Sequence, residues 1–281
     1  MAVDLHAHST ASDGSFAPSE LVDLAVERRL TALALTDHDT LEGLDEALSA
    51  AEDTGIELIP GTELSLGYER GGMHLVVLWL QPGNGPLQDK LAGLQSGRET
   101  RNFRIVEILQ EHGMDITMVE IEAEAGGGTI GRPHIAAVMI EKGYVEDMRA
   151  AFDDWLGNDS PAYVNRPRLN PEEAIDLARQ SGAVPILAHP HTLGVRRSRE
   201  MAELLDRLRD AGLVGLESIY ASYRRHEREG YSDLARRFGL VPSGGSDFHG
   251  TYKPGLDLGI GYGDLGIEES VLEELRGFAV Q

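Results

Sequence analysis

Short apolar runs alternate along the chain with longer segments in which apolar residues recur at the spacing of an amphipathic helix. The short runs are rich in Val, Leu and Ile, which is typical of buried strands. This alternation predicts an α/β protein in which helices pack around a sheet. The expected strands are Ala2–Leu5, Thr31–Leu35, Glu57–Ile59, His74–Trp79, Val184–Ala188, Gly215–Ile219 and Leu240–Pro242.

A few residues mark the ends of the intervening helices. Pro18 has the position of a first helical turn, and Gly55 follows a helix that begins near Glu42. Asn170 has the character of an N-cap because Pro171 follows it and acids come directly after the proline.

The stretch from residue 96 to residue 161 has a different pattern. It is mostly helical, with expected helices at Arg98–His112, Pro133–Lys142 and Glu146–Leu156, and is interrupted by the glycines 126–128. We interpret residues 96–161 as a helical insertion, called the insert below, which caps a site. Residues 1–95 and 162–281 then form one barrel-like domain.

Composition narrows the classes of partner. The chain has 281 residues, with 47 acids against 25 Lys and Arg, and a net charge of −22. Such a charge disfavours binding along duplex DNA or an anionic membrane, but it allows a small anion at one site. Cysteine is absent, which excludes disulfides, thiolate metal ligands and cysteine nucleophiles. The first residues, MAVDLHAHS, do not resemble a signal peptide, so we expect a cytoplasmic protein.

Histidines and acids gather where the expected strands end. His6 and His8 end the first strand, and because alternate residues of a strand share a face, both rings can reach one ion. The carboxyl ends of barrel strands are also where catalytic residues gather. The other residues that follow expected strands are Asp37 and His38, Glu63, His189, and Asp247 with His249, while His74 opens or flanks the fourth strand.

Imidazole and carboxylate ligands without thiolate suit Mn²⁺, Zn²⁺ or Fe²⁺. A single ion needs three or four protein ligands, and more candidates than that converge here, so a cluster of two or three ions is predicted. Two ions can share a hydroxide nucleophile, which suits phosphoester hydrolysis. Taken singly, a histidine is more often a core or surface group, so the prediction depends on the two separated pairs, His6 with His8 and Asp247 with His249.

The motifs DLHAHSTASDG, LTDHDT, GTELS, AHP and GSDFH resemble, in that order, those of the PHP (polymerase and histidinol phosphatase) family. The resemblance covers roughly residues 2–80 and 165–265. GRPH, at residues 131–134, resembles a motif of the branch that includes 3′,5′-nucleoside bisphosphate phosphatases and a 5′→3′ exoribonuclease. The resemblance implies a distorted (β/α)7 TIM-like barrel, a site for three metal ions and a helical insertion domain.

The same resemblance implies a ligand set. His6, His8, Glu63 and Asp247 would hold a first ion, and Glu63 would bridge to a second ion bound by His74 and His189. A third ion would be bound by Asp13, His38 and His249. By itself, Asp13 before Gly14 is equally typical of a turn. Asp37 is a candidate catalytic residue that orients His38 or the attacking water.

Substrate contacts are expected from basic residues. Arg132 and His134 lie at a loop-to-helix junction, where a guanidinium and free N–H groups can bind phosphate. Arg166 could meet a second phosphate or stack on a base, and Arg196 belongs to a local basic cluster. His191 could protonate the leaving oxygen. Each of these residues could instead be an ordinary surface, linker or loop residue.

We therefore expect a metal-dependent phosphoric ester hydrolase that acts on phosphate monoesters of small nucleotides, of the 3′,5′-bisphosphate or AMP type, through a metal-bridging hydroxide. The alternatives are a 5′→3′ exoribonuclease acting on short RNA ends, a histidinol-phosphate phosphatase, and a non-catalytic PHP metal-binding module.

Overall fold

The computed structural model describes residues 2–126, 128–158, 160–195 and 197–279. Its centre is one sheet with the strand order β7-β6-β5-β4-β3-β2-β1-β8. The strands are β1 (Ala2–Ala7), β2 (Leu30–Leu35), β3 (Glu57–Leu66), β4 (Met73–Leu78), β5 (Val184–Leu187), β6 (Gly215–Tyr220), β7 (Val241–Gly245) and β8 (Ile267–Glu268).

The sheet curves into a nearly closed barrel. Just beyond β7, the Asp247 N–H donates to the His6 carbonyl at 2.8 Å, and the His8 N–H donates to the Phe248 carbonyl at 2.9 Å. These bonds join the last long strand to the first one. The first residues of β1, Ala2 and Val3, pair with the short antiparallel β8. The predicted α/β barrel is confirmed, with β8 as a small addition.

One strand runs against its neighbours. β4 is antiparallel to both β3 and β5, whereas β1, β2 and β3 are parallel to one another, as are β5, β6 and β7. The amino end of β4 therefore lies at the same end of the barrel as the carboxyl ends of the other long strands. His74, the second residue of β4, reaches that end for this reason.

Helices surround the barrel because each presents an apolar stripe to the sheet. They are α1 (Pro18–Glu27), α2 (Leu44–Ala51), α7 (Pro171–Gln180), α8 (Ser198–Asp210), α9 (Arg225–Arg237) and α10 (Glu269–Arg276). The predicted cap of α7 is present, since the Asn170 side chain accepts the N–H groups of Glu172 and Glu173. None of the described helices is long and apolar enough to cross a bilayer.

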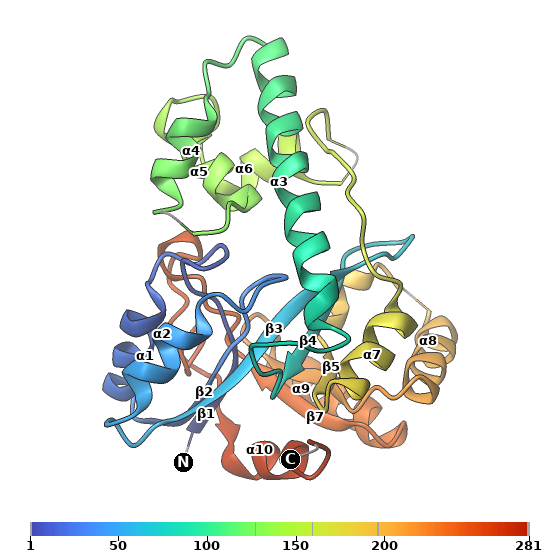
Figure 1. Ribbon diagram of the computed structural model, residues 1–281. Helices are drawn as coiled ribbons and strands as arrows, with labels where there is room; N and C mark the ends of the chain where they lie inside the picture. The colour runs from blue at the N-terminus through green and yellow to red at the C-terminus, as the bar shows by residue number, and fades with distance from the viewer. Residues whose placement is uncertain (1, 127, 159, 196, 280–281) are drawn as a thin grey trace.

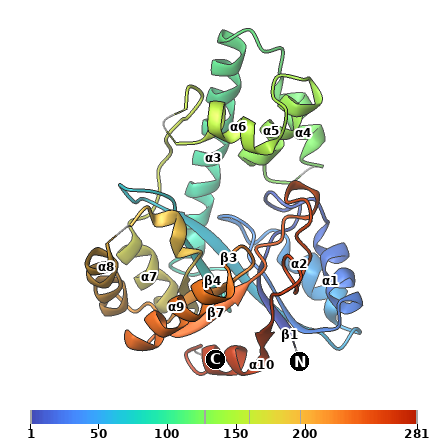
Figure 2. The same ribbon diagram turned by 180° about the vertical axis from the view of Figure 1, so that it is seen from behind.

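Between β4 and α7 the chain forms a second group of helices. These are α3 (Gln88–Glu111), α4 (Met118–Glu124), α5 (Arg132–Glu141) and α6 (Met148–Ala151), followed by a π-helical turn at Phe152–Leu156. A hydrophobic cluster of their own, drawn from residues 105–164, holds them together. Figures 1 and 2 show α4, α5 and α6 beside the upper half of α3, at the end of the barrel away from α10 and both termini.

Two of the expected helices differ from the observed ones. α3 begins at Gln88 rather than Arg98, so the expected boundary at residue 96 falls inside it. In the part that was missed, residues 88–97, the buried side chains are Leu91 and Leu94, and Gly93 and Gly97 lower the helix propensity. The helix expected over Glu146–Leu156 is shorter, and its second half is a π-helical turn.

Candidate metal centre

Glu63 lies at the centre of a buried group of histidines. We had expected Glu63 to follow the third strand, but β3 continues to Leu66, so Glu63 lies inside it. One carboxylate oxygen is 2.9 Å from a ring nitrogen of His74 and of His189. The other oxygen lies within 3.3 Å of ring nitrogens of His6, His8 and His38.

The surroundings of Glu63 keep it ionised. Burial opposes ionisation, but the charges of the adjoining histidines outweigh it and hold the pKa of Glu63 well below its ordinary value. A carboxylate in this position can contact more than one cation at a time.

The predicted ligands form three overlapping groups. In each group the possible ligand atoms lie within 4.8 Å of one another. The first group is His6, His8, Glu63 and Asp247; the second is His38, Glu63 and His74; the third is His8, Asp13, His38 and His249. His189 adjoins the first two groups through its contact with Glu63.

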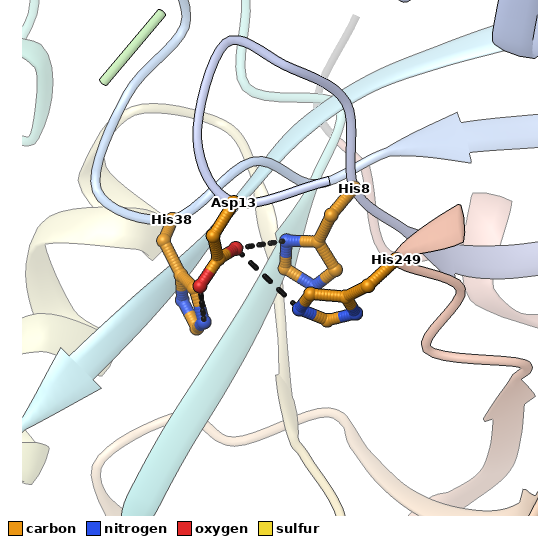
Figure 3. Close-up of side chains that lie close together, drawn as sticks. All are labelled: His8, Asp13, His38 and His249. Carbon is orange, nitrogen blue, oxygen red and sulfur yellow. Dashed lines mark ion pairs between the residues drawn. The ribbon is translucent and has the colours of Figure 1, made fainter. Parts of the chain in front are cut away.

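The third group is shown in Figure 3. Asp13 lies among three imidazoles, 3.4 Å from the Nε2 atom of His249 and 3.8 Å from ring nitrogens of His8 and His38. These distances exceed ordinary hydrogen bonds. Two ligands that are each about 2.1 Å from one tetrahedral ion lie about 3.4 Å apart, so this donor set fits a divalent cation.

The backbone is strained at two of these residues. His189 has φ 23° and Asp247 has φ 54°, values that side-chain-bearing residues rarely adopt. Each such conformation costs about 1–3 kcal/mol and persists only where the surroundings enforce it. Here it turns both side chains toward Glu63 and the histidines.

Glu217, in β6, is a site residue that the sequence analysis missed. One of its oxygens is 2.8 Å from His6 Nδ1, and the other accepts the backbone N–H of His189 at 2.6 Å. The carboxylate thus orients one ring and holds one strained backbone. A lone acid within the apolar run GLESIY was the available signal. Nearby, the Tyr220 hydroxyl donates to Asp247 at 2.7 Å.

Glu217→Gln is expected to weaken divalent-ion binding about 10- to 100-fold, because partners of metal-binding histidines contribute that much to affinity. The amide has one oxygen and cannot accept from both residues. Competition with a chromogenic chelator would measure the change. Glu229→Gln on α9 is the matched control and should leave affinity unchanged, because Glu229 is exposed and its one ion pair among the described residues is with Arg225. Unchanged affinity in Glu217→Gln would contradict this role.

Asp37 and His191 were expected to act in catalysis. Asp37 is buried and accepts hydrogen bonds from the hydroxyls of Ser9 and Ser12. These bonds hold the loop that carries Asp13, whereas the expected contact was with His38 or water. Burial raises the pKa of Asp37. His191 stands next to the cluster, with its ring 6.1 Å from that of His189 and its Nδ1 2.9 Å from the Tyr223 hydroxyl.

A cavity of about 270 Å³ opens onto the ligand groups. Asp13, His38, His74 and His189 line part of it. Five arginines from α3, the start of α5 and the chain after the insert also line it, and we call them the arginine wall: Arg98, Arg101, Arg132, Arg166 and Arg168.

Asp39 is the carboxylate that pairs with this wall. One of its oxygens is 2.5 Å from an Nη2 atom of both Arg98 and Arg166, and the other accepts the Ser65 N–H at 3.1 Å. Among the described residues, no other acid forms an ion pair with the arginine wall. The buried Nε atoms of Arg98, Arg166 and Arg168 have no hydrogen-bond partner there.

The other three arginines of the wall, Arg101, Arg132 and Arg168, have no acidic partner within the described part of the chain. Arg132 donates to the Leu156 carbonyl at 2.8 Å, and burial beside other arginines lowers its pKa to about 10. Arg101 contacts the side-chain oxygen of Asn102, and its pKa is also lowered by burial and neighbouring guanidinium groups. Such a wall attracts anions.

Two other expected substrate residues, His134 and Arg166, are already engaged in contacts within the protein. The buried Nδ1 of His134 accepts the N–H of Gly131 at 3.0 Å, so this ring caps the start of α5. Arg166 is in the wall but is already paired with Asp39. Arg196 lies outside the described residues.

Comparisons with known proteins agree with this geometry. The family model described as PHP domain matches residues 4–157. A 3′,5′-nucleoside bisphosphate phosphatase from Chromobacterium violaceum is 34% identical over 92% of this chain and 90% of its own. A 5′-3′ exoribonuclease from Haemophilus influenzae is 34% identical over 88% of this chain and 89% of its own.

The fold of this chain also matches that of solved structures. A protein from Bifidobacterium adolescentis, called a metal-dependent phosphoesterase, superposes with a TM-score of 0.87 at 31% identity, covering 99% of this chain and 96% of its own. The motifs, the barrel, the buried ligand groups and these likenesses lead to one conclusion: this chain belongs to the PHP family.

Proposed function

We propose that this chain is a metal-dependent phosphoesterase that hydrolyses a phosphate monoester of small nucleotides bearing a second phosphate and releases inorganic phosphate. The observation that carries the proposal is the cavity, which is lined both by members of the His, Asp and Glu ligand groups and by the arginine wall. Two or three Mn²⁺, Zn²⁺ or Fe²⁺ ions suit the ligand groups. When bound, such ions supply Lewis acidity and activate water.

The arginine wall supports a substrate with two anionic groups. Its guanidinium groups outnumber their one carboxylate partner, Asp39, and several buried donors there lack a partner among the described residues. Leaving buried donors unpaired is costly, so a bound anion would stabilise the wall. One phosphate would then lie at the ligand groups and the other at the wall, held by charge-assisted hydrogen bonds.

Individual residues have distinct proposed tasks. We assign Arg132 to the transferring phosphoryl group, whose charge it would offset, and the other arginines of the wall to the second phosphate. The Tyr223 hydroxyl accepts the backbone N–H of His191 and lies 2.9 Å from its Nδ1. A protonated His191 ring would donate its Nδ1–H to this hydroxyl and could pass its Nε2 proton to the leaving oxygen, becoming neutral. Residues 96–161 would be the cap that supplies Arg98, Arg101 and Arg132.

A second candidate is 5′→3′ trimming of short RNA, which uses the same chemistry and matches the name of the H. influenzae relative. Histidinol phosphate fits less well, because its cationic amine would face the arginine wall.

The test compares adenosine 3′,5′-bisphosphate with each adenosine monophosphate. We expect kcat/KM to be about 100-fold or more higher for the bisphosphate, because a site built to bind a polar group discriminates strongly against its absence. Phosphate release would be measured with Mn²⁺, Zn²⁺ and Fe²⁺ in turn, alongside 5′-phosphorylated oligoribonucleotides and histidinol phosphate. No release with any ion would contradict the enzyme assignment, and equal rates would contradict the role of the wall.

A further inference from the structure

We infer that the insert positions Asp13 and His249, the two ligands used only by the third group, so that this group retains its ion only while the insert is docked on the barrel. The inference rests on the metal-dependent function proposed above. It concerns Glu124, Thr129, Gly131 and His134, residues at the end of α4 and the start of α5.

The insert packs directly on the loop that carries Asp13. Thr129 donates its N–H to the Ala11 carbonyl at 3.3 Å. Gly131 lies so close that an added Cβ would be 2.8 Å from the Asp13 Cβ and 3.2 Å from its Oδ2. On the opposite side, Asp37 holds the same loop through Ser12 at 2.6 Å. Asp13 is therefore fixed between the barrel and the insert.

The insert also reaches the segment that carries His249. A 3-10 turn (Gly250–Tyr252) follows this histidine, and the Tyr252 hydroxyl donates to Glu124 at 2.8 Å. The Tyr252 ring lies 5.5 Å from the ring of His134. His134 in turn accepts the Gly131 N–H, so one short stretch of the insert supports both ligands.

The two supported segments also hold each other, since the Thr251 N–H donates to the Ser15 hydroxyl at 2.8 Å. Figure 3 shows the result, with Asp13 and His249 facing each other across the group.

Other ligands are supported by the barrel. Glu63 contacts histidines of the barrel, His189 is held by Glu217, and Asp247 is held by Tyr220. No described hydrogen bond to these three ligands comes from the insert. Disturbing the insert should therefore affect the third group selectively.

The test is the number and affinity of bound ions in Gly131→Ala. The new methyl group would displace Asp13, and we expect the affinity of the weakest ion to fall about 10- to 100-fold, or one ion per chain to be lost on dialysis, while the tighter ions remain. Elemental analysis and Mn²⁺ titration give both numbers, and thermal unfolding reports on the fold.

Two further variants make the result specific. Tyr252→Phe removes the bond to Glu124 without adding bulk, and should weaken the same ion by a smaller factor. Gly93→Ala is the matched control, because Gly93 lies exposed on α3 with open space around it, and should bind ions as the unmodified chain does.

The outcomes separate this inference from the proposed function. Unchanged ion number and affinity in both Gly131→Ala and Tyr252→Phe would overturn the inference, as would an unmodified chain that binds only two ions. An unmodified chain that binds no Mn²⁺, Zn²⁺ or Fe²⁺ would overturn the proposed function itself.

Discussion

Phosphoester hydrolysis is expected to fall at least about 100-fold in kcat/KM when Glu63 is replaced by glutamine, since even indirect supports of metal ligands contribute 10- to 100-fold. The substitution keeps the size of the side chain but removes the negative charge at the centre of the first two ligand groups. Its amide nitrogen would also point at a ring nitrogen of His74 or His6. Steady-state rates with saturating Mn²⁺ would measure the loss.

Glu57→Gln provides the comparison for this variant. Glu57 begins the same strand, but it is partly exposed and pairs with Arg276 at the far end of the barrel. It should retain full activity. Full activity in Glu63→Gln would remove Glu63 from the metal centre, and equal losses in both variants would indicate damage to the strand instead.

The free energy of unfolding is expected to fall by about 3–5 kcal/mol in Asp39→Asn, because breaking a buried ion pair leaves an uncompensated charge. Asp39 is fully buried, and so are the Arg98 and Arg166 side chains that it joins. Asparagine tolerates the left-handed backbone at this position, where φ is 57°, so the substitution tests charge rather than strain. Urea unfolding at pH 7 without phosphate would measure the change.

The pH dependence of this effect has a definite sign. Burial opposes ionisation of Asp39, but Arg98 and Arg166 outweigh it and hold its pKa far below the ordinary value. A lowered pKa contributes stability that is fully present above the unfolded value of about 3.9 and is lost as pH falls through the folded value. The difference between Asp39→Asn and the unmodified chain should therefore be constant near neutrality and shrink below about pH 4.

A surface pair serves as the control for Asp39. Asp257 pairs with Arg28 at 2.9 Å, and both side chains are about one-third exposed. Asp257→Asn should cost less than about 1 kcal/mol. Inorganic phosphate should stabilise Asp39→Asn more than the unmodified chain, because the freed guanidinium groups would bind it better. Equal stability of the two Asp→Asn variants would contradict the buried-pair argument.

The barrel was predictable because its strands are buried and read as continuous apolar runs. Prediction failed where buried positions are polar. β3 was expected to end at Ile59, although it continues to Leu66, because the polar Thr62, Glu63 and Ser65 break the apolar pattern. The beginning of α3 was missed for a different reason, since Gly93 and Gly97 weaken the helical signal of residues 88–97.

The metal ligands could be proposed from sequence because most of them follow or adjoin a strand and, apart from His74, belong to a motif. The arginine wall could not be assembled in the same way. Its members come from α3, from α5 and from the segment near Arg166, and only the tertiary structure brings them to Asp39. Glu217 was overlooked because a single acid in a strand has no partner that is visible in the sequence.

The reversed direction of β4 also bears on how the chain folds. Leu78, the last residue of β4, pairs with Val184, the first residue of β5, so residues 79–183 are the connection of a single hairpin. The entropy of closing such a loop grows only slowly with its length, but contacts between distant residues slow folding. The cluster within residues 105–164 needs only nearer contacts. We therefore expect it to assemble first, and the late alignment of β5 with β4 to set the rate at which the barrel closes.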